Sequence, residues 1–291
     1  MEKRLIARGL LAGAVGAVLA FAFSRVFAEP IVGRAIDYED GRTEAAHAQG
    51  VHEHGAELLS RGVQGNAGLG FGVLIFGIAM GALFAVLFCV AYQRVASVGP
   101  QQLSMRLAAG AGIAVYLVPF VKYPPNPPAV GQADTIGSRT LWYLVMVLAS
   151  VVLALAAVWL GGRLAPRLGA WNAGLAAVGA YIAATAVVML VLPTFDETPG
   201  PMRDAAGTIT YPGFPADVLY EFRLASLGTQ VVLWATIGVV FSMLARRLLD
   251  AAAGTRRAAS IAAGPASEPH RQADIGVARD DRCHGGRAVP G

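Results

Sequence analysis

The sequence has 291 residues, of which 55% are hydrophobic and only 14% are charged, with a formal net charge of +4. An average soluble domain carries about 25% charged residues, so this composition argues against a soluble enzyme. The apolar residues fall into blocks that suit a bilayer core, which a helix of about 20 residues can cross. We therefore predict an all-α integral membrane protein, a bundle of six transmembrane helices over residues 5–27, 68–92, 103–121, 141–160, 170–192 and 224–244.

The first predicted helix follows the basic residues Lys3, Arg4 and Arg8, which favours an N-terminus in the cytoplasm. Its end, with Val26 and Ala28, also fits a signal-peptidase site, and cleavage there would leave five helices. The apolar run is longer than the usual signal-peptide core of about 7–15 residues, and this favours a retained helix.

Three long loops and two short ones connect the predicted helices. The first and last long loops, residues 29–66 and 193–223, are rich in acid, whereas the short connections carry arginines. The middle long loop starts with a proline-rich segment, residues 122–131, that has four prolines in five positions. This segment must be extended, because proline removes backbone donors and restricts its predecessor. One topology satisfies every loop: both termini are cytoplasmic and the long loops lie outside.

We divide the chain into a polytopic membrane domain, residues 1–247, and a disordered cytoplasmic tail, residues 248–291. The tail is rich in Ala, Gly, Arg, Ser and Pro without periodicity. The positive charge does not indicate a nucleic-acid partner, because the arginines fall at helix ends and in this tail. Cys89 and Cys283 show no paired spacing, so no disulfide framework or Cys-based zinc site is expected.

Three of the five histidines lie close together in the first long loop, as His47, His52 and His54, with Glu44 and Glu57 on either side. Imidazole and carboxylate groups suit divalent ions such as cobalt, nickel and zinc. If residues 44–58 are helical, Glu44, His47 and His54 share a face; if they are extended, His52 and His54 do. We predict a metal role for this cluster, with a solvated polar loop as the alternative.

The last long loop adds two further candidate ligands, Asp196 and Glu197, where a predicted helix ends before a proline. It leads into Glu221 and Arg223, which are two residues apart and would not face each other on a helix. Each needs another partner, and Arg25 is a candidate for Glu221 or Asp196. Polar groups near membrane depth are often paired or functional. The candidates for a transport path or for helix pairing are Arg25, Asn126, Glu221, Arg223 and Gln230.

Several ordered motifs resemble the CbtA family of probable cobalt transporter subunits over residues 1–247. They are the basic start of a Gly/Ala-rich helix, His52-Glu-His54, Lys122-Tyr-Pro-Pro-Asn-Pro-Pro-Ala-Val-Gly131 with Thr135-Ile-Gly-Ser-Arg-Thr140, Leu192-Pro-Thr-Phe-Asp-Glu-Thr-Pro199, and Phe214-Pro-Ala-Asp-Val-Leu-Tyr-Glu-Phe-Arg-Leu-Ala-Ser226. The resemblance implies a multi-pass protein of the bacterial inner membrane that serves cobalt supply for cobalamin synthesis. It also implies a small single-helix membrane partner of the CbtB type.

The leading interpretation is thus a non-enzymatic subunit for metal uptake, with Co²⁺ as cargo and no cofactor. No nucleotide-binding motif occurs in the sequence, so energy would come from a partner, an ion gradient or the membrane potential. The alternatives are a membrane scaffold that carries no substrate and a metal-dependent hydrolase. The sequence lacks a His-Glu-x-x-His motif, which argues against the hydrolase. Association of the chain with itself stays open.

Overall fold

The computed structural model describes residues 2–50, 69–94 and 98–262. Contacts divide the chain into two compact units, Met1–Leu249 and Asp250–Gly291. The first unit holds the helical bundle and all the sites discussed below. Of the second, the structure describes the residues up to Ala262, which form the last turns of a helix.

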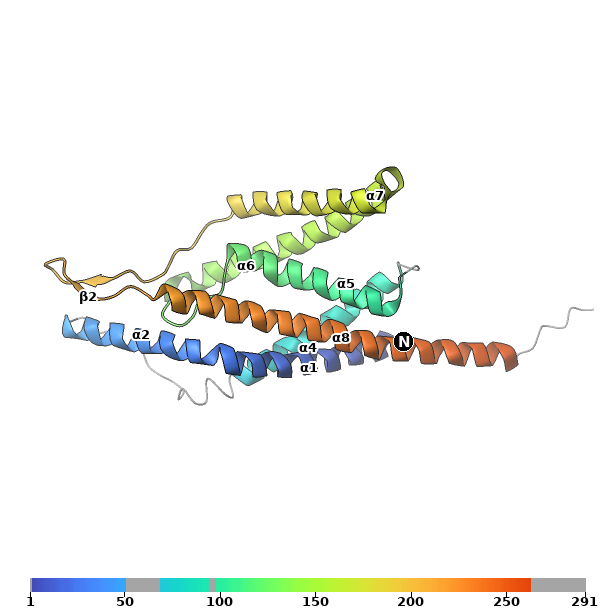
Figure 1. Ribbon diagram of the computed structural model, residues 1–291, viewed down its shortest axis with the longest axis horizontal. Coiled ribbons are helices and arrows are strands. Elements are labelled where there is room, and N and C mark those ends of the chain that lie inside the picture. The colour runs from blue at the N-terminus through green and yellow to red at the C-terminus, as the bar shows by residue number, and fades with distance from the viewer. Residues whose placement is uncertain (1, 51–68, 95–97, 263–291) are drawn as a thin grey trace, which may run out of the picture. The chain divides into compact units, whose positions relative to one another are not determined.

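Among the described residues, five helices are long and apolar enough to cross a membrane, which confirms the predicted all-α membrane fold. Figure 1 shows them side by side in the bundle. The third of these spans is one continuous helical rod with a π-helical turn, η2, in its middle, immediately before Pro119. The spans are α1 (Glu2–Phe27), α4 (Leu69–Tyr92), α5–η2–α6 (Pro100–Gly112, Ile113–Leu117, Val118–Lys122), α7 (Ile136–Val191) and α8 (Ala216–Ala262).

Helix α7 contains two of the six predicted spans. Its 56 residues would extend about 84 Å as a straight rod, far beyond a bilayer core of about 30 Å. At Gly169 the backbone leaves helical geometry with φ 76°, a conformation that suits glycine. The chain reverses there, so the two arms of α7 are antiparallel and lie side by side. A 2.7 Å hydrogen bond between the Ser150 and Tyr181 hydroxyls joins them. The predicted connection 161–169 is therefore helical as far as Leu168.

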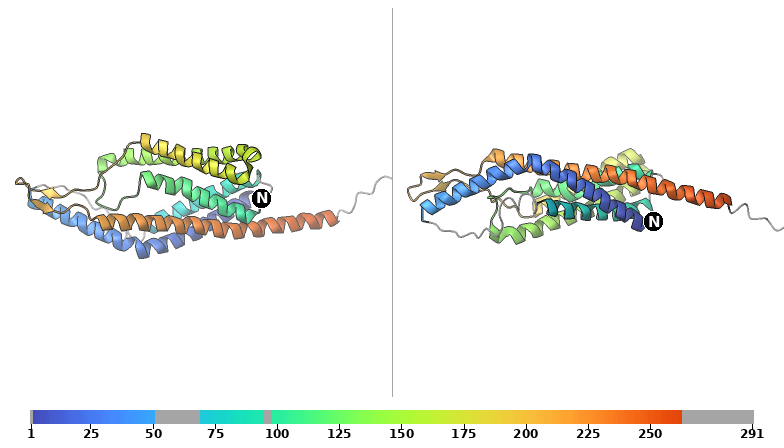
Figure 2. Two further views of the ribbon diagram at one scale, coloured as in Figure 1. Left: turned by 45° about the horizontal axis from the view of Figure 1, so that its top comes forward. Right: turned by 90° about the horizontal axis from the view of Figure 1, so that it is seen from below.

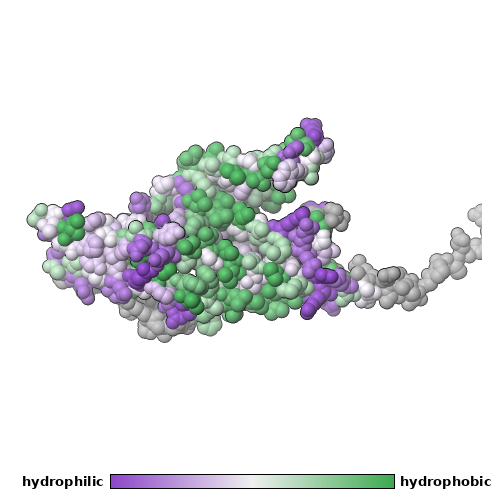
Figure 3. All heavy atoms as spheres, viewed as in Figure 1, coloured by the Kyte–Doolittle hydropathy of each residue, from purple (hydrophilic) through white to green (hydrophobic). Residues whose placement is uncertain are grey.

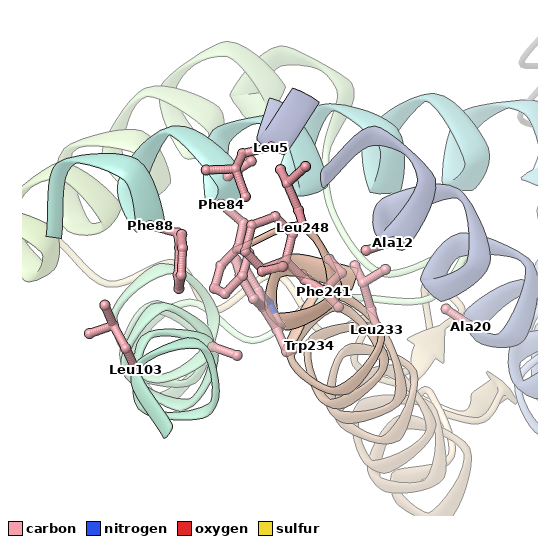
Figure 4. Packing of buried hydrophobic residues seen from close by; sticks show 14 residues of the cluster. Leu5, Ala12, Ala20, Phe84, Phe88, Leu103, Leu233, Trp234, Phe241 and Leu248 are labelled. Carbon is pink, nitrogen blue, oxygen red and sulfur yellow. The ribbon is translucent and has the colours of Figure 1, made fainter. Parts of the chain in front are cut away.

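The bundle core has two parts: a close backbone contact between α1 and α4, and a layer of large side chains against α8. Gly9 and Gly13 of α1 approach Gly81 and Gly77 of α4 so closely that no side chain would fit between the helices. Such small-residue faces allow transmembrane helices to pack tightly. Around this contact, Phe84 and Phe88 of α4 pack against Phe241 of α8 (Figure 4).

The ends of the bundle are polar and its middle is apolar. Figure 3 shows hydrophobic residues over the middle of the face in view, with hydrophilic residues at both ends. One end, which we call the α2 end, holds the helix α2, the proline-rich segment (residues 122–131) and a β-hairpin. The end of α4, the start of α5 and the turn within α7 lie at the other. This separation agrees with the predicted grouping of long and short loops.

Residues 29–66 were predicted as a long loop, with the conformation of residues 44–58 left open, but residues 29–48 form a helix. Helix α2 (Glu29–Ala48) continues from the end of α1 and projects beyond the bundle (Figure 2). Its Pro30 stands in the first turn, where proline is favoured. Ile31, Ala35 and Tyr38 are buried at helical spacing. Charged residues stand between the members of this apolar face in the sequence.

A second, smaller core holds α2 against the chain that enters α8. Ile31, Ala35 and Tyr38 pack against Val130 of the proline-rich segment and Phe214. The adjoining antiparallel hairpin consists of β1 (Met202–Arg203) and β2 (Ile209–Tyr211). The Tyr38 hydroxyl donates to the carbonyl of Pro212 over 3.0 Å. The α2 end is therefore an ordered polar cap rather than a set of separate loops.

Helix α8 extends to Ala262, beyond residue 247, where we placed the end of the membrane domain. The first part of the predicted tail, residues 248–262 with the run Asp250-Ala-Ala-Ala, is thus helical. Alanine has the highest helix propensity of all residues, which explains the continuation. The rest of the predicted tail, residues 263–291, lies outside the described residues.

Candidate functional site

At the α2 end, the proline-rich segment is fastened to the start of the last long loop. The Tyr123 hydroxyl donates to the carbonyl of Pro193 over 2.7 Å, and its ring lies 6.1 Å from that of Phe195. Immediately after this segment, the backbone amide of Gln132 donates to the Glu197 carboxylate over 2.9 Å. These contacts join two loops that are about 65 residues apart in the chain.

Arg139, in the first turn of α7, forms the charged centre of this junction. Its Nη1 lies 3.2 Å from Glu197 Oε2, and the Glu197 side chain is only 8% exposed. The guanidinium packs so closely on Gly131 that a Cβ at that position would collide with it. Gly131 also has φ 126°, which side chains rarely adopt. A glycine at this position thus allows both the bend in the loop and the close packing of Arg139.

The Glu197 carboxylate is stabilised in its charged form. The Thr135 hydroxyl, the Gln132 amide and the Arg139 guanidinium hold its pKa below the usual 4.5, although burial acts in the opposite direction. A lowered pKa in the folded state means that the contribution to stability is complete above pH 4.5 and disappears as pH falls through the folded value. The junction should therefore loosen under acid conditions.

We expect the variant Glu197→Gln to lose this pH-dependent part of the stability. The melting temperature of the native chain should exceed that of the variant at neutral pH, and the difference should shrink as pH falls below 4.5. Thermal unfolding in detergent, measured over a pH series for both proteins, checks this. A difference that stays constant or grows with acid would contradict the assignment.

Glu221 and Arg223 have different partners, as their spacing predicts. Glu221 pairs with Arg34 of α2, and Arg223 donates through Nη2 to Asn126 Oδ1 of the proline-rich segment over 3.2 Å. Our suggested partner for Arg25 was wrong. Arg25 lies 3.2 Å from Glu29, one turn ahead on the helical path, because the loop that we predicted after α1 is helical.

Tyr116, which lies in the π-helical turn η2, lines two cavities. The first has a volume of about 440 Å³ and lies beneath the proline-rich segment. Arg139, Arg223 and Asn126 line it. The second, about 330 Å³, is an apolar groove between α5–η2 and α8. Gln230 is a polar residue in its lining. Single π-helical turns are frequent at functional sites.

The metal-ligand candidates are placed as follows. His47 is exposed in the last turn of α2, which ends at Ala48, and Gly50 follows with φ 84°. His52, His54 and Glu57 lie outside the described residues. Asp196 is exposed, while Glu197 faces Arg139. Within residues 2–50, 69–94 and 98–262, no three histidine, cysteine or carboxylate side chains are grouped to hold a metal ion. The predicted cluster stays a prediction.

On α2, His47 ends a row of acidic side chains. Asp37, Asp40, Glu44 and His47 are all exposed and lie within about 80° of one another around the helix. The buried residues Ile31, Ala35 and Tyr38 are on the opposite face. We call this set the α2 stripe.

Lys122, Arg139 and Arg34 were not predicted as site residues from the sequence. The structure places Lys122 in the lining of the first cavity, Arg139 in that lining and in the junction, and Arg34 in the α2–α8 ion pair. One signal was available. Lys122 and Arg139 border apolar spans, and a cation at membrane depth needs a partner. The identity of the partner, 58 residues away in the case of Arg139, follows only from the tertiary structure.

Comparison with known proteins gives one match. The family model described as probable cobalt transporter subunit (CbtA) matches residues 2–246. Neither a curated protein nor a solved structure matches the chain.

Proposed function

The chain belongs to the CbtA family of probable cobalt transporter subunits, and on this basis we propose that it is the membrane subunit of a system that imports cobalt for cobalamin synthesis. The family is one of transporter subunits rather than enzymes. The proposed location is the bacterial inner membrane, with the α2 end outside and the N-terminus in the cytoplasm. A small single-helix protein of the CbtB type is the proposed partner.

The α2 stripe is the observation that supports metal capture at the outer end. Three carboxylates and an imidazole on one exposed helix face create a negative surface that raises the local concentration of divalent cations. Imidazole and carboxylate are suitable ligands for Co²⁺. His47 ends the stripe and is followed along the chain by His52, His54 and Glu57, so the captured ion would pass from the stripe to these residues.

Asp196 and Glu197 are weaker candidates for this capture site. Asp196 is exposed and could add a carboxylate. Glu197 would have to exchange Arg139 for the metal ion, because the two side chains form an ion pair. We therefore assign the first contact with the ion to the α2 stripe and the histidines.

The membrane potential can supply the driving force. Moving one charge through 100 mV is worth about 2.3 kcal/mol, and a dication gains about twice as much on entering a negative interior. That corresponds to an accumulation of roughly three orders of magnitude. A facilitator without its own ATPase is therefore energetically sufficient.

Cobalt-57 uptake by cells that express the chain, with and without the small partner, tests the proposal. We expect the triple variant His47→Ala, His52→Ala, His54→Ala to lower uptake at least about tenfold, because even groups that only support metal ligands are worth 10–100-fold in affinity. Asp37→Asn with Glu44→Gln should lower the uptake rate at low cobalt and less at high cobalt, since these residues concentrate the ion.

Asp134→Asn is the matched control. It removes an exposed carboxylate from the turn between the proline-rich segment and α7, which is not part of the α2 stripe, and should leave uptake unchanged at equal membrane abundance. Chain-dependent uptake that ignores the histidines would exclude their role in capture. Absence of chain-dependent uptake with and without the partner would favour the alternative, a scaffold for another membrane complex.

A further inference from the structure

The first cavity is lined by three cations, and the carboxylates that act on two of them, Glu197 on Arg139 and Asp196 on Arg223, are not part of its lining. Lys122, Arg139 and Arg223 all face it, and its lining includes no carboxylate. Arg139 has Glu197 as its counter-ion. Arg223 contacts a neutral amide, Asn126, and Lys122 lies 5.8 Å from the ring centre of Tyr123. Among the described residues, neither Lys122 nor Arg223 has a carboxylate within ion-pair distance.

The two arginines have hydrogen-bonding capacity left. The Nε donors of Arg139 and Arg223 are buried and meet no acceptor among the described residues. Unsatisfied donors and unpaired cations in a partly buried site are costly. Guanidinium groups match phosphate and carboxylate oxygens in shape and charge. The cavity therefore has the chemistry of an oxyanion site, and it would repel a free divalent cation.

The apolar groove lies along α8, the helix that also carries Arg223 of the first cavity. Arg223 is followed by Leu227, Val231 and Trp234 at spacings of four, four and three residues, which places them on one face of the helix. The distance from Arg223 to Trp234 along the axis is about 16 Å. Leu227, Val231 and Trp234 line the groove, and Tyr116 lines both cavities. The charged cavity, which we call the chamber, and the apolar groove thus share Tyr116 and one face of α8.

We propose that a phospholipid with an anionic headgroup binds here, with its phosphate near Arg139, Arg223 and Lys122 and an acyl chain in the groove. The site lies where apolar spans meet the polar cap, and Tyr116, Phe120 and Tyr143 line the chamber. Aromatic side chains are enriched at this membrane depth. A soluble oxyanion would occupy only the chamber, whereas an amphiphile accounts for the charged chamber and the apolar groove together.

Native mass spectrometry of the full chain tests this, after removal of lipid in detergent and addition of phosphatidylglycerol or phosphatidylcholine. We expect the native chain to retain one phosphatidylglycerol in preference to phosphatidylcholine. Lys122→Gln with Arg223→Gln should weaken that binding about 30-fold, which corresponds to about 1 kcal/mol for each cation removed. Arg203→Gln, which removes a cation from the exposed β1 strand, is the matched control and should bind like the native chain.

The variant Ala109→Leu separates a lipid from a soluble anion. Ala109 is exposed and lines the groove, so leucine should fill it and weaken lipid binding about tenfold. Stabilisation by inorganic phosphate, read as a shift in melting temperature, should survive this change. Elution profile and circular dichroism check that each variant is folded. Equal lipid retention by all variants, or phosphate stabilisation with lipid binding unaffected by Ala109→Leu, would overturn the proposal.

Discussion

The variant Gly13→Leu is expected to prevent assembly of the bundle, with a loss of more than about 3 kcal/mol. An added Cβ at Gly13 would collide with the carbonyl oxygen of Gly77 and would stand 3.0 Å from the Cα of Gly81. Both are backbone atoms, so no side chain can move aside. The helices α1 and α4 would have to separate. The close contacts that small residues allow between transmembrane helices would then be lost.

Gly72→Leu is the control for this prediction. It lies on α4, and an added Cβ there meets no other atom within 4 Å. This variant should give a single monodisperse peak in size-exclusion chromatography and a melting temperature near that of the native chain. For Gly13→Leu we expect aggregation or loss of the protein from the membrane fraction. Equal yields and melting temperatures for the two variants would contradict the close contact between α1 and α4.

The variant Phe241→Ala should be the most damaging large-to-small change in the core, at about 3–5 kcal/mol. Phe241 is fully buried, and its ring lies 5.2 Å from that of Phe84 and 5.0 Å from that of Phe88. In lipid the loss comes chiefly from missing contacts, because lipid chains are themselves apolar and helix association depends on packing. The cavity would lie between α4 and α8.

We expect thermal unfolding of Phe241→Ala in detergent to begin roughly 6–20 °C below that of the native chain. Phe71→Ala is the matched control, because Phe71 is on α4 and is 67% exposed. Its melting temperature should change little. If the melting temperatures of both variants fall by the same amount, the contact of α8 with α4 does not stabilise the bundle.

The membrane spans could be predicted from the sequence because each is a long apolar block. A bilayer requires such length and composition, whatever the neighbouring helices are. The different partners of Glu221 and Arg223 were also predictable, since residues two apart on a helix do not face each other. In each case local chain geometry and the lipid environment decide the outcome.

Helix α2 and the cavity under the proline-rich segment were not predicted, for two separate reasons. The apolar face of α2 is narrow, with Ile31, Ala35 and Tyr38 standing between charges. The cavity depends on Arg139 and Arg223, which come from different helices. Their proximity follows from the packing of α7 and α8 at the proline-rich segment, and no local pattern shows it.

The chain reversal at Gly169 bears on the order in which the protein is assembled during synthesis. The Ser150–Tyr181 contact between the arms of α7 spans only 31 residues, so the hairpin can form before α8 has been made. The core cluster that contains Leu5 also contains Leu248, and it must wait for nearly the whole membrane domain. Contacts between segments close in sequence form fastest. The α7 hairpin can thus enter the membrane as an early, independent unit, and the arrival of α8 completes the core.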